Sequence, residues 1–279
     1  MKFSVLTASY KQLGWLKRAI RSVADQEGVE VEHLIQDGNS GPELVNYVRE
    51  NTNASIVSEP DRGMYDALNK AFDRVTGDVF SILNCDEQYL PGTLARVKAE
   101  FEAYPDTDLV IGDCLLINPE NELIAFRRST PLRESMILTD HLYDLTCTLF
   151  FHRRVLDRGI RFDAERFRAA GDADWVVRLL RSGLKMRLIR HYTATFLILP
   201  DNLSLTDAPK REGAYLEAMA PGWARALAPV LRCLRHMEKW LAGGYSSGPI
   251  EYAIYATDDA GQRTTFRCEK PSFRHPWGK

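Results

Sequence analysis

The sequence lacks the cysteine patterns that stabilise small secreted domains or bind zinc. Its five cysteines are odd in number and scattered, and no two of them form a C-x-x-C pair. Disulfide frameworks and zinc sites depend on paired or closely spaced cysteines. We therefore expect neither, and we expect the chain to work in a reducing compartment.

Long apolar runs and a leader segment are also missing. No apolar stretch reaches the roughly 18 residues that a membrane-spanning helix needs. Residues 1–6 run directly into an apolar segment, without the charged, apolar and cleavage regions of a signal peptide. We expect a cytoplasmic protein, with at most a peripheral contact to the inner face of the membrane.

The chain carries little net charge, -2 at pH 7, and this charge is unevenly distributed. Residues 205–279 hold more basic than acidic side chains, and the larger part before them holds more acidic ones. This distribution excludes a broad basic footprint on the larger part. We therefore expect no nucleic-acid partner.

Two glycine-rich phosphate-binding motifs are absent. No G-x-G-x-x-G follows the first predicted strand, and G-x-x-x-x-G-K-[ST] occurs nowhere in the chain. Neither a dinucleotide-type Rossmann site nor a P-loop is therefore expected. If a nucleotide binds here, other residues must hold it.

What the sequence does contain is an alternation of strand and helix patterns. Apolar, β-favouring runs at residues 3–8, 31–36, 54–58 and 78–83 are separated by segments with helical spacing. This alternation favours an α/β fold with a mostly parallel sheet and helices on both faces. Later patterns predict strands over residues 109–112, 146–151 and 186–199, a hairpin over 114–127 and a helix over 174–181.

The pattern changes in the C-terminal part, so we divide the chain into a larger domain, residues 1–205, and an appendage, residues 206–279. Residues 214–241 favour a helix that Pro221 and Pro229 must interrupt. Residues 250–268 read as a β-hairpin. The helix mixes Trp and Leu with Arg and Lys, which fits contact with anionic lipid, with the larger domain or with a second subunit. We favour packing against protein, because the prolines interrupt the apolar stripe.

Polar residues follow four of the predicted strands, at residues 7–10, 37–38, 59–63 and 84–87. The carboxyl ends of parallel strands meet at one edge of a sheet, where such folds bind ligands. The tetrapeptide Asn84-Cys85-Asp86-Glu87 brings two carboxylates to this edge, and Mg²⁺ and Mn²⁺ prefer oxygen ligands. This tetrapeptide indicates a site for a metal-bound diphosphate, although Asp is also common as a helix cap.

Five segments occur in order within residues 1–205: V-L-T-A-S-Y, Q-D-G-N-S, S-E-P-D-R-G-M-Y-D-A-L-N-K-A, G-D-V-F-S-I-L-N-C-D-E and G-D-A-D-W-V-V-R-L. This series resembles the family 2 glycosyltransferases of the GT-A fold. The resemblance implies a single nucleotide-binding domain that transfers a sugar, with inversion, from a nucleoside-diphosphate sugar to an acceptor hydroxyl. It also implies Mg²⁺ or Mn²⁺ on the diphosphate. We expect a saccharide or lipid-linked saccharide acceptor in the synthesis of bacterial lipopolysaccharide, capsule or exopolysaccharide.

The resemblance assigns nucleotide-sugar contacts to several residues. It implies that Asp37 binds the base or ribose of the nucleotide. Asp61 and Arg62 would lie over the nucleotide sugar, where a guanidinium can donate two parallel hydrogen bonds to a diphosphate. The wall beside the nucleotide would be formed by Thr7, Ser9 and Tyr10.

The metal site would be the counterpart of the family's D-x-D element. Here Asn84 replaces the first Asp, Cys85 fills the space between, and Asp86 supplies the carboxylate. Whether Asn84 or Glu87 also binds the metal stays open at this point.

Inverting transfer also needs a base to deprotonate the acceptor hydroxyl. Asp172 and Asp174 are the candidates, and the resemblance selects Asp172, six residues before Arg178. Asp172 could also cap a helix, which would not exclude it as the base.

Two other functions are compatible with these residues. A protein that binds nucleotide sugars without catalysis is favoured only by Asn84, and the retained Asp86 and Asp172 argue against it. A sugar nucleotidyltransferase would carry a glycine-rich, basic loop after the first strand. Residues 7–12 do not form such a loop. Neither the sequence pattern nor the resemblance specifies an oligomeric state, and a homo-oligomer is compatible with both.

Overall fold

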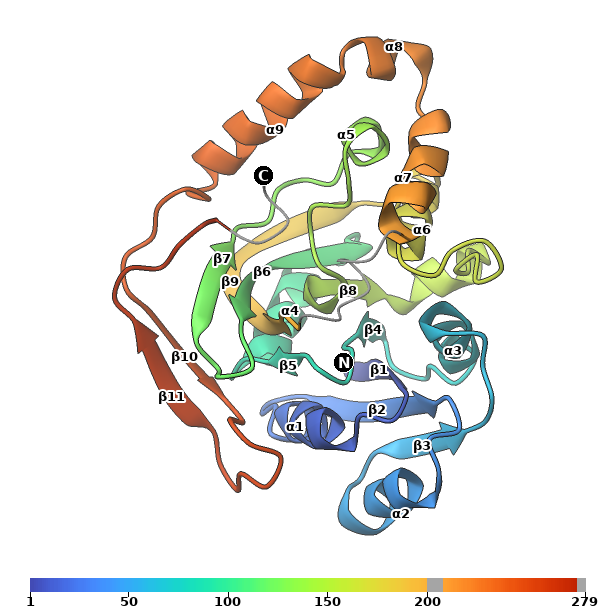
Figure 1. The fold of residues 1–279 in the computed structure, drawn as a ribbon, viewed down its shortest axis with the longest axis vertical. Helices are drawn as coiled ribbons and strands as arrows, with labels where there is room; N and C mark the ends of the chain where they lie inside the picture. The colour runs from blue at the N-terminus through green and yellow to red at the C-terminus, as the bar shows by residue number, and fades with distance from the viewer. Residues whose placement is uncertain (200–207, 275–279) are drawn as a thin grey trace.

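The first part of the chain alternates between strands and helices, as the sequence predicts (Figure 1). The computed structural model describes residues 1–199 and 208–274. The elements of this part are β1 (Lys2–Ser9), α1 (Leu13–Ala24), β2 (Glu30–Asp37), α2 (Pro42–Asn51), β3 (Ser55–Ser58), α3 (Met64–Phe72), β4 (Val79–Ile82), β5 (Gln88–Tyr89) and α4 (Thr93–Ala103). The sequence does not predict β5, because a two-residue strand carries no periodicity.

The middle of the chain corrects two predictions. β6 is one long strand that runs through residues 112–113, where the sequence suggests two shorter strands. β8 begins only at Leu149, since a 3-10 turn occupies residues 146–148. The elements here are β6 (Leu109–Ile117), β7 (Leu123–Arg127), α5 (Glu134–Thr139), η1 (Thr146–Thr148), β8 (Leu149–His152), η2 (Arg153–Arg158), α6 (Gly171–Arg181) and β9 (Met186–Leu197).

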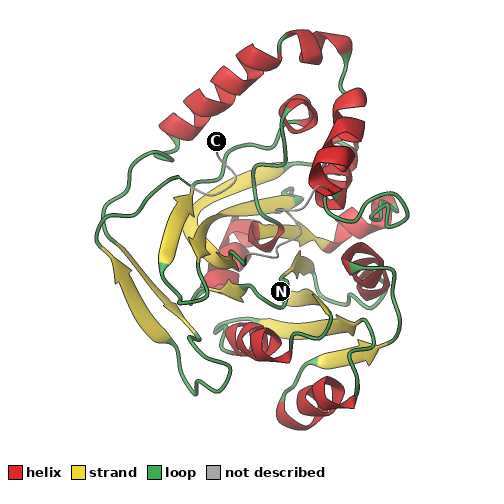
Figure 2. Cartoon of the chain, viewed as in Figure 1, coloured by secondary structure: helices red, strands yellow, loops and turns green. Residues whose placement is uncertain are grey.

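One nine-stranded sheet runs through the centre of the molecule, in the order β3-β2-β1-β4-β8-β6-β9-β5, with β7 paired to β6 (Figure 2). The strands β3, β2, β1 and β4 are all parallel. The other half is mixed, because β8 runs antiparallel to both β4 and β6 while β6 and β9 are parallel. Ser9, Asp37 and Ser58 stand next to one another across β1, β2 and β3. The predicted polar strand ends therefore share one edge of the parallel half.

Helices cover both faces of the sheet, as predicted. Along β1, Phe3 and Val5 pack against residues of α1 and α4, whereas Leu6 packs with α3 and α6. The alternation follows from the pleat of a strand, which directs successive side chains to opposite faces. Hydrophobic clusters on both faces thus hold the sheet between two layers of helices.

The helix α6 is fixed to the sheet by aromatic side chains. Trp175 is fully buried and lies 4.6 Å from Phe162 and 4.9 Å from Phe151, measured between ring centroids. Its indole N–H donates a hydrogen bond to the carbonyl of Ile160 at 3.2 Å. Trp175 therefore fixes the position of α6 against the sheet.

The C-terminal part forms three helices and a hairpin: α7 (Ala208–Ala218), α8 (Gly222–Ala226), α9 (Ala228–Leu241), β10 (Ile250–Ile254) and β11 (Thr264–Cys268). Pro221 precedes α8 and Pro229 stands in the first turn of α9, so the prolines divide the predicted helix. The hairpin packs on the larger domain, where Gln88 and Tyr255 exchange two hydrogen bonds. The boundary at residues 205–206 lies outside the described residues. In the described part of the chain, no helix is both long and apolar enough to cross a membrane.

Candidate active site

A cleft of about 1310 Å³ opens at the carboxyl ends of β1, β2 and β4. One wall consists of these strand ends and the start of α3. The facing wall consists of α5, the loop after it, the start of α6 and part of α7. The volume of the cleft exceeds the roughly 300–1,000 Å³ typical of sites for drug-sized ligands. The cleft is thus large enough for a ligand with several chemical parts.

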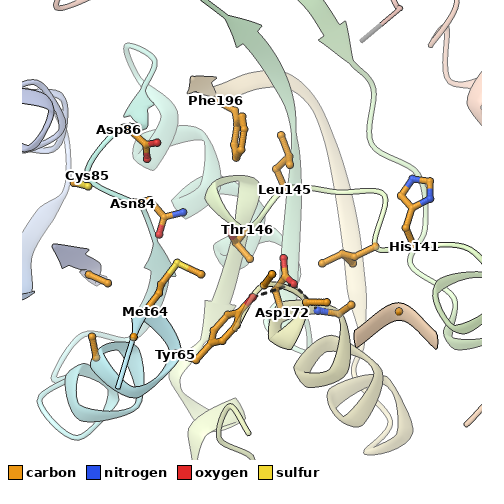
Figure 3. Close-up of a pocket in the computed structure, with 18 of the residues that line it drawn as sticks. Met64, Tyr65, Asn84, Cys85, Asp86, His141, Leu145, Thr146, Asp172 and Phe196 are labelled. Atoms are coloured by element: carbon orange, nitrogen blue, oxygen red, sulfur yellow. Dashed lines mark hydrogen bonds between the residues drawn. The ribbon is translucent and has the colours of Figure 1, made fainter. Parts of the chain in front are cut away.

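Most of the predicted site residues meet in this cleft. Those that line it are Ser9, Tyr10, Asp61, Asn84, Cys85, Asp86 and Asp172. Figure 3 shows Asn84, Cys85 and Asp86 on the loop that follows β4, and Asp172 on a different wall at the start of α6. Residues far apart in the sequence therefore face one cavity.

Asp37 and Thr7 lie behind the cleft wall. Asp37 is fully buried and accepts hydrogen bonds from the Ser40 backbone N–H at 2.8 Å and the Ser58 hydroxyl at 2.6 Å. Thr7 is also fully buried, and its hydroxyl donates to the carbonyl of Leu83 at 2.6 Å. Both side chains tie neighbouring strand ends together. Their contact with a nucleotide stays a prediction.

Arg62 lies at the surface beside α3 and does not line the cleft. Its guanidinium pairs with Asp66 at 3.1 Å and with Glu165 at 3.2 Å. Asp61, in contrast, reaches into the cleft, and a Cβ at Gly38 would stand only 2.7 Å from its Oδ2. The glycine therefore lets the ends of β2 and β3 approach closely. A contact of Arg62 with a diphosphate also remains a prediction.

The two carboxylates of the acidic turn after β4, those of Asp86 and Glu87, have different surroundings. The Asn84 backbone N–H donates to Glu87 Oε2 at 2.7 Å, and Glu87 does not line the cleft. Burial, together with the nearby Asp86 charge, raises the pKa of Glu87 to about 8. Glu87 therefore closes the turn from beneath, while Asp86 faces the cavity.

The same turn fits a hard divalent cation. Asn84 Oδ1 is buried and has no hydrogen-bond partner among the described residues, and it belongs to a side chain that lines the cleft beside Asp86. Mg²⁺ and Mn²⁺ take oxygen ligands, and Mg²⁺ typically binds through one or two carboxylates plus phosphate oxygens and water. No group of three His, Cys, Asp or Glu side chains suited to a metal occurs in residues 1–199 and 208–274. Such an ion would thus depend on ligands from the substrate.

Asp172 is the second residue of α6. It is therefore not the N-cap residue, which is Ala170. Its Oδ1 accepts hydrogen bonds from the Ala173 backbone N–H at 2.9 Å and from the Tyr65 hydroxyl at 3.4 Å (Figure 3). Burial raises the pKa of Asp172 to about 6, while these hydrogen bonds lower it. A carboxylate with this pKa is a stronger base than an exposed aspartate and is still largely ionised at neutral pH.

Asp174, the second candidate for the base, forms an ion pair within α6. It is 5% exposed and pairs with Arg178 on the same helix, with 2.6 Å between Oδ2 and Nη2. It does not line the cleft. Asp172 and Asp174 therefore point to different surroundings, as expected for residues two apart on a helix.

Tyr65 and Glu212 are site residues that the sequence pattern did not reveal. The Tyr65 ring packs against the start of α6, where a Cβ at Gly171 would stand 2.7 Å from it. Glu212, on α7, accepts hydrogen bonds from the backbone N–H groups of Arg168, Ala169 and Ala170 at 2.8, 3.0 and 2.7 Å. Both contacts join distant segments, so no local spacing could have predicted them.

The facing wall adds further ionisable side chains that the sequence analysis left without a role. His141 lines the cleft, and its Nδ1 lies 3.0 Å from Asp140 Oδ1. Asp144 and Arg127 also line it, and burial raises the pKa of Asp144 to about 7. Arg127 ends β7, and His141 and Asp144 lie in the loop after α5, a region that carries no recognisable motif.

Comparisons with known proteins relate the chain to glycosyltransferases. Residues 4–165 match the model of glycosyl transferase family 2. A PGL/p-HBAD biosynthesis glycosyltransferase of Mycobacterium bovis is 30% identical over 41% of this chain and 47% of its own length. An uncharacterised glycosyltransferase of Mycobacterium tuberculosis is 36% identical over 31% of this chain and 34% of its own. The chain thus matches between a third and a half of the length of these relatives.

Solved structures support the fold. TarS of S. aureus, in complex with UDP, superposes with a TM-score of 0.58 at 15% identity, covering 94% of this chain and 98% of TarS 1-349. The mannosyltransferase PcManGT of Pyrobaculum calidifontis, in complex with GDP-Man and Mn²⁺, gives 0.53 at 17% identity over 87% of this chain and 79% of its own. The curled sheet with its covering helices is therefore the GT-A fold, as the sequence predicts. Since the family model covers more than half of the sequence, the chain belongs to glycosyl transferase family 2.

Proposed function

We propose that the protein is an inverting, metal-dependent glycosyltransferase that moves a sugar from a nucleoside-diphosphate sugar to an acceptor hydroxyl. The observation that carries the proposal is the placement of Asp172 across one cleft from the Asn84–Asp86 turn (Figure 3). In an inverting displacement the base and the leaving diphosphate stand on opposite sides of the sugar carbon. Two separate acidic positions in one cavity fit this requirement.

The turn after β4 would hold the leaving group. Asp86 and Asn84 are the residues that fit Mg²⁺ or Mn²⁺, since both line the cleft and Asn84 Oδ1 has no hydrogen-bond partner within residues 1–199 and 208–274. When bound, the ion offsets the negative charge that develops on the diphosphate. The nucleotide would extend from there along Ser9, Tyr10 and Asp61, which line the same wall.

Asp172 would accept the proton of the acceptor hydroxyl. The Tyr65 hydroxyl and the Ala173 N–H both donate to Oδ1, so Oδ2 is the oxygen for the proton. Burial raises the pKa of Tyr65 well above its usual value, so the phenol stays protonated and keeps donating. The two donors hold the carboxylate in one orientation.

We further propose a saccharide or lipid-linked saccharide acceptor and a role in bacterial surface polysaccharide synthesis, at the cytoplasmic side of the membrane. The glycosyltransferase relatives support sugar transfer in general. The facing wall, which carries His141 and Asp144, is the part of the cleft left for the acceptor.

The proposal is tested by incubating the protein with a panel of nucleotide sugars, Mn²⁺ and saccharide acceptors, followed by proton NMR of the product. A nucleoside diphosphate and a product of inverted anomeric configuration are expected. Retained configuration would contradict the mechanism. Pyrophosphate released from a nucleoside triphosphate and a sugar phosphate would instead identify a nucleotidyltransferase.

A further inference from the structure

The helix α9 turns its apolar side away from the protein. Val230, Leu234, Met237 and Leu241 recur at helical spacing and are between 40% and 70% exposed. Trp240 is 68% exposed, and no residue of α9 is buried. A surface helix of a globular protein normally buries such a stripe. We call these five side chains the α9 apolar face.

The polar side of α9 faces the domain instead. Arg235 pairs with Asp140 at 2.6 Å, and Glu238 pairs with Arg133 at 2.6 Å. Both partners belong to the α5 region, which α9 contacts. These ion pairs, together with Leu231, which packs against the core, fix the orientation of the helix and leave the apolar face outward. Figure 1 shows α8 and α9 along the outer rim of the molecule.

The exposed charge on this segment is positive. Of the charged side chains in residues 222–241, Arg235, Glu238 and Lys239 are partly buried, and Arg235 and Glu238 form their ion pairs on the domain side. Arg225 and Arg232 are exposed, as is Trp223 of α8. Trp, Leu and exposed cations on one helical segment are typical of helices that lie in the interface of anionic membranes.

Anionic lipid complements the exposed charges of this segment. Arg225 and Arg232 are exposed cations, and the one acidic side chain, Glu238, pairs with Arg133 on the domain side. A second copy of the chain fits this face less well, because a twofold interface uses the same patch on both subunits and would supply no opposite charge.

From these observations we infer that the α9 apolar face docks the protein on an anionic lipid surface. This inference concerns α8 and α9 and stands apart from the donor chemistry. One consequence rests on the proposed function: α5 both contacts α9 and lines the cleft, so docking would bring the facing wall beside the membrane. A lipid-linked acceptor would then reach the cleft.

The test is flotation of the full chain with vesicles, without nucleotide. Vesicles of phosphatidylglycerol and phosphatidylcholine are compared with phosphatidylcholine alone. We expect binding to the anionic vesicles that weakens as salt is raised, because exposed charges are screened. The double variant Trp240→Gln, Leu241→Gln should lose about tenfold or more of this binding, since both apolar side chains leave the interface.

The matched control is Val57→Gln with Tyr104→Gln, two exposed apolar residues elsewhere on the surface. This control should bind as the unchanged chain does. Failure of the unchanged chain to bind anionic vesicles, or equal binding to neutral ones, would overturn the inference. The inference would also be overturned if light scattering showed that the unchanged chain is an oligomer and that the Trp240, Leu241 double variant is not. The face would then belong to a second copy. Sugar transfer in solution without vesicle binding would overturn docking and leave the proposed function intact.

Discussion

Glu212 of α7 accepts a hydrogen bond from the backbone N–H of Ala170, the N-cap residue of α6, at 2.7 Å. Two further backbone N–H groups just before it donate to the same carboxylate. The C-terminal part of the chain thus holds the loop that leads into Asp172. Glu212 acts as a positioning residue, since its contacts are with this loop.

Replacing Glu212 with Gln should therefore impair turnover more than donor binding. One oxygen that accepts a backbone N–H becomes an amide nitrogen, so the loop shifts, and we expect kcat to fall about 10- to 100-fold. The KM for the donor should change little. The Glu212 charge raises the pKa of Asp172, so its loss should also move the acid limb of the pH profile to lower pH.

The matched control for Glu212 is Glu251→Gln, an exposed carboxylate on β10. It should leave kcat and the pH profile unchanged. A Glu212→Gln protein with unaltered kcat and profile would show that the contact with Ala170 does not position the base.

Tyr65→Phe should move the acid limb in the opposite direction. Because Asp172 must be ionised to act as a base and burial raises its pKa to about 6, the rate should fall as the pH drops through that value. The Tyr65 hydroxyl stabilises the ionised form, so removing it raises the pKa of Asp172, by less than about one unit for this single bond. The pH dependence of kcat/KM measures the shift. Tyr104→Phe is the control and should leave the profile unchanged. If Tyr65→Phe instead moved the acid limb to lower pH, the Tyr65 hydrogen bond would not be what stabilises ionised Asp172.

Asp86→Ala should weaken metal-dependent binding of nucleoside diphosphates. Loss of a residue that only supports a metal ligand typically lowers metal affinity about 10- to 100-fold. Loss of the ligand Asp86 itself should weaken binding by at least this factor. Isothermal titration with UDP and GDP, each with Mn²⁺ and with EDTA, measures the difference. Asp106→Ala, at an almost fully exposed position, should leave both affinities unchanged. Equal affinities for Asp86→Ala and the unchanged chain would remove Asp86 from the metal site.

The sequence predicted the parallel half of the sheet because each strand there is apolar and ends in polar residues. The same pattern found Asp61, Asn84 and Asp86, which do line the cleft. It could not separate Asp86 from Glu87, since which carboxylate faces the cavity depends on how the turn folds back on Asn84.

The parts of the site that the sequence missed depend on long-range contacts. Tyr65 meets Asp172 across 107 positions of the chain, and no spacing rule connects them. The outward apolar side of α9 was equally hidden, because periodicity reveals a stripe but not the direction in which it points. The sequence favours packing of that helix against protein, and α9 does contact the domain, through Leu231 and through its charged side.

The central claim, that Asp172 is the base of a sugar transfer, is tested most directly by comparing Asp172→Asn with Asp174→Asn. Nucleoside diphosphate release from the donor found in the panel, together with donor affinity, should be measured for both. Asp172→Asn should bind the donor normally and turn over about 10²- to 10⁴-fold more slowly. Asp174→Asn loses a buried ion pair, so it should unfold at lower temperature yet keep its rate per folded molecule. An Asp172→Asn protein with near-normal turnover would contradict the account.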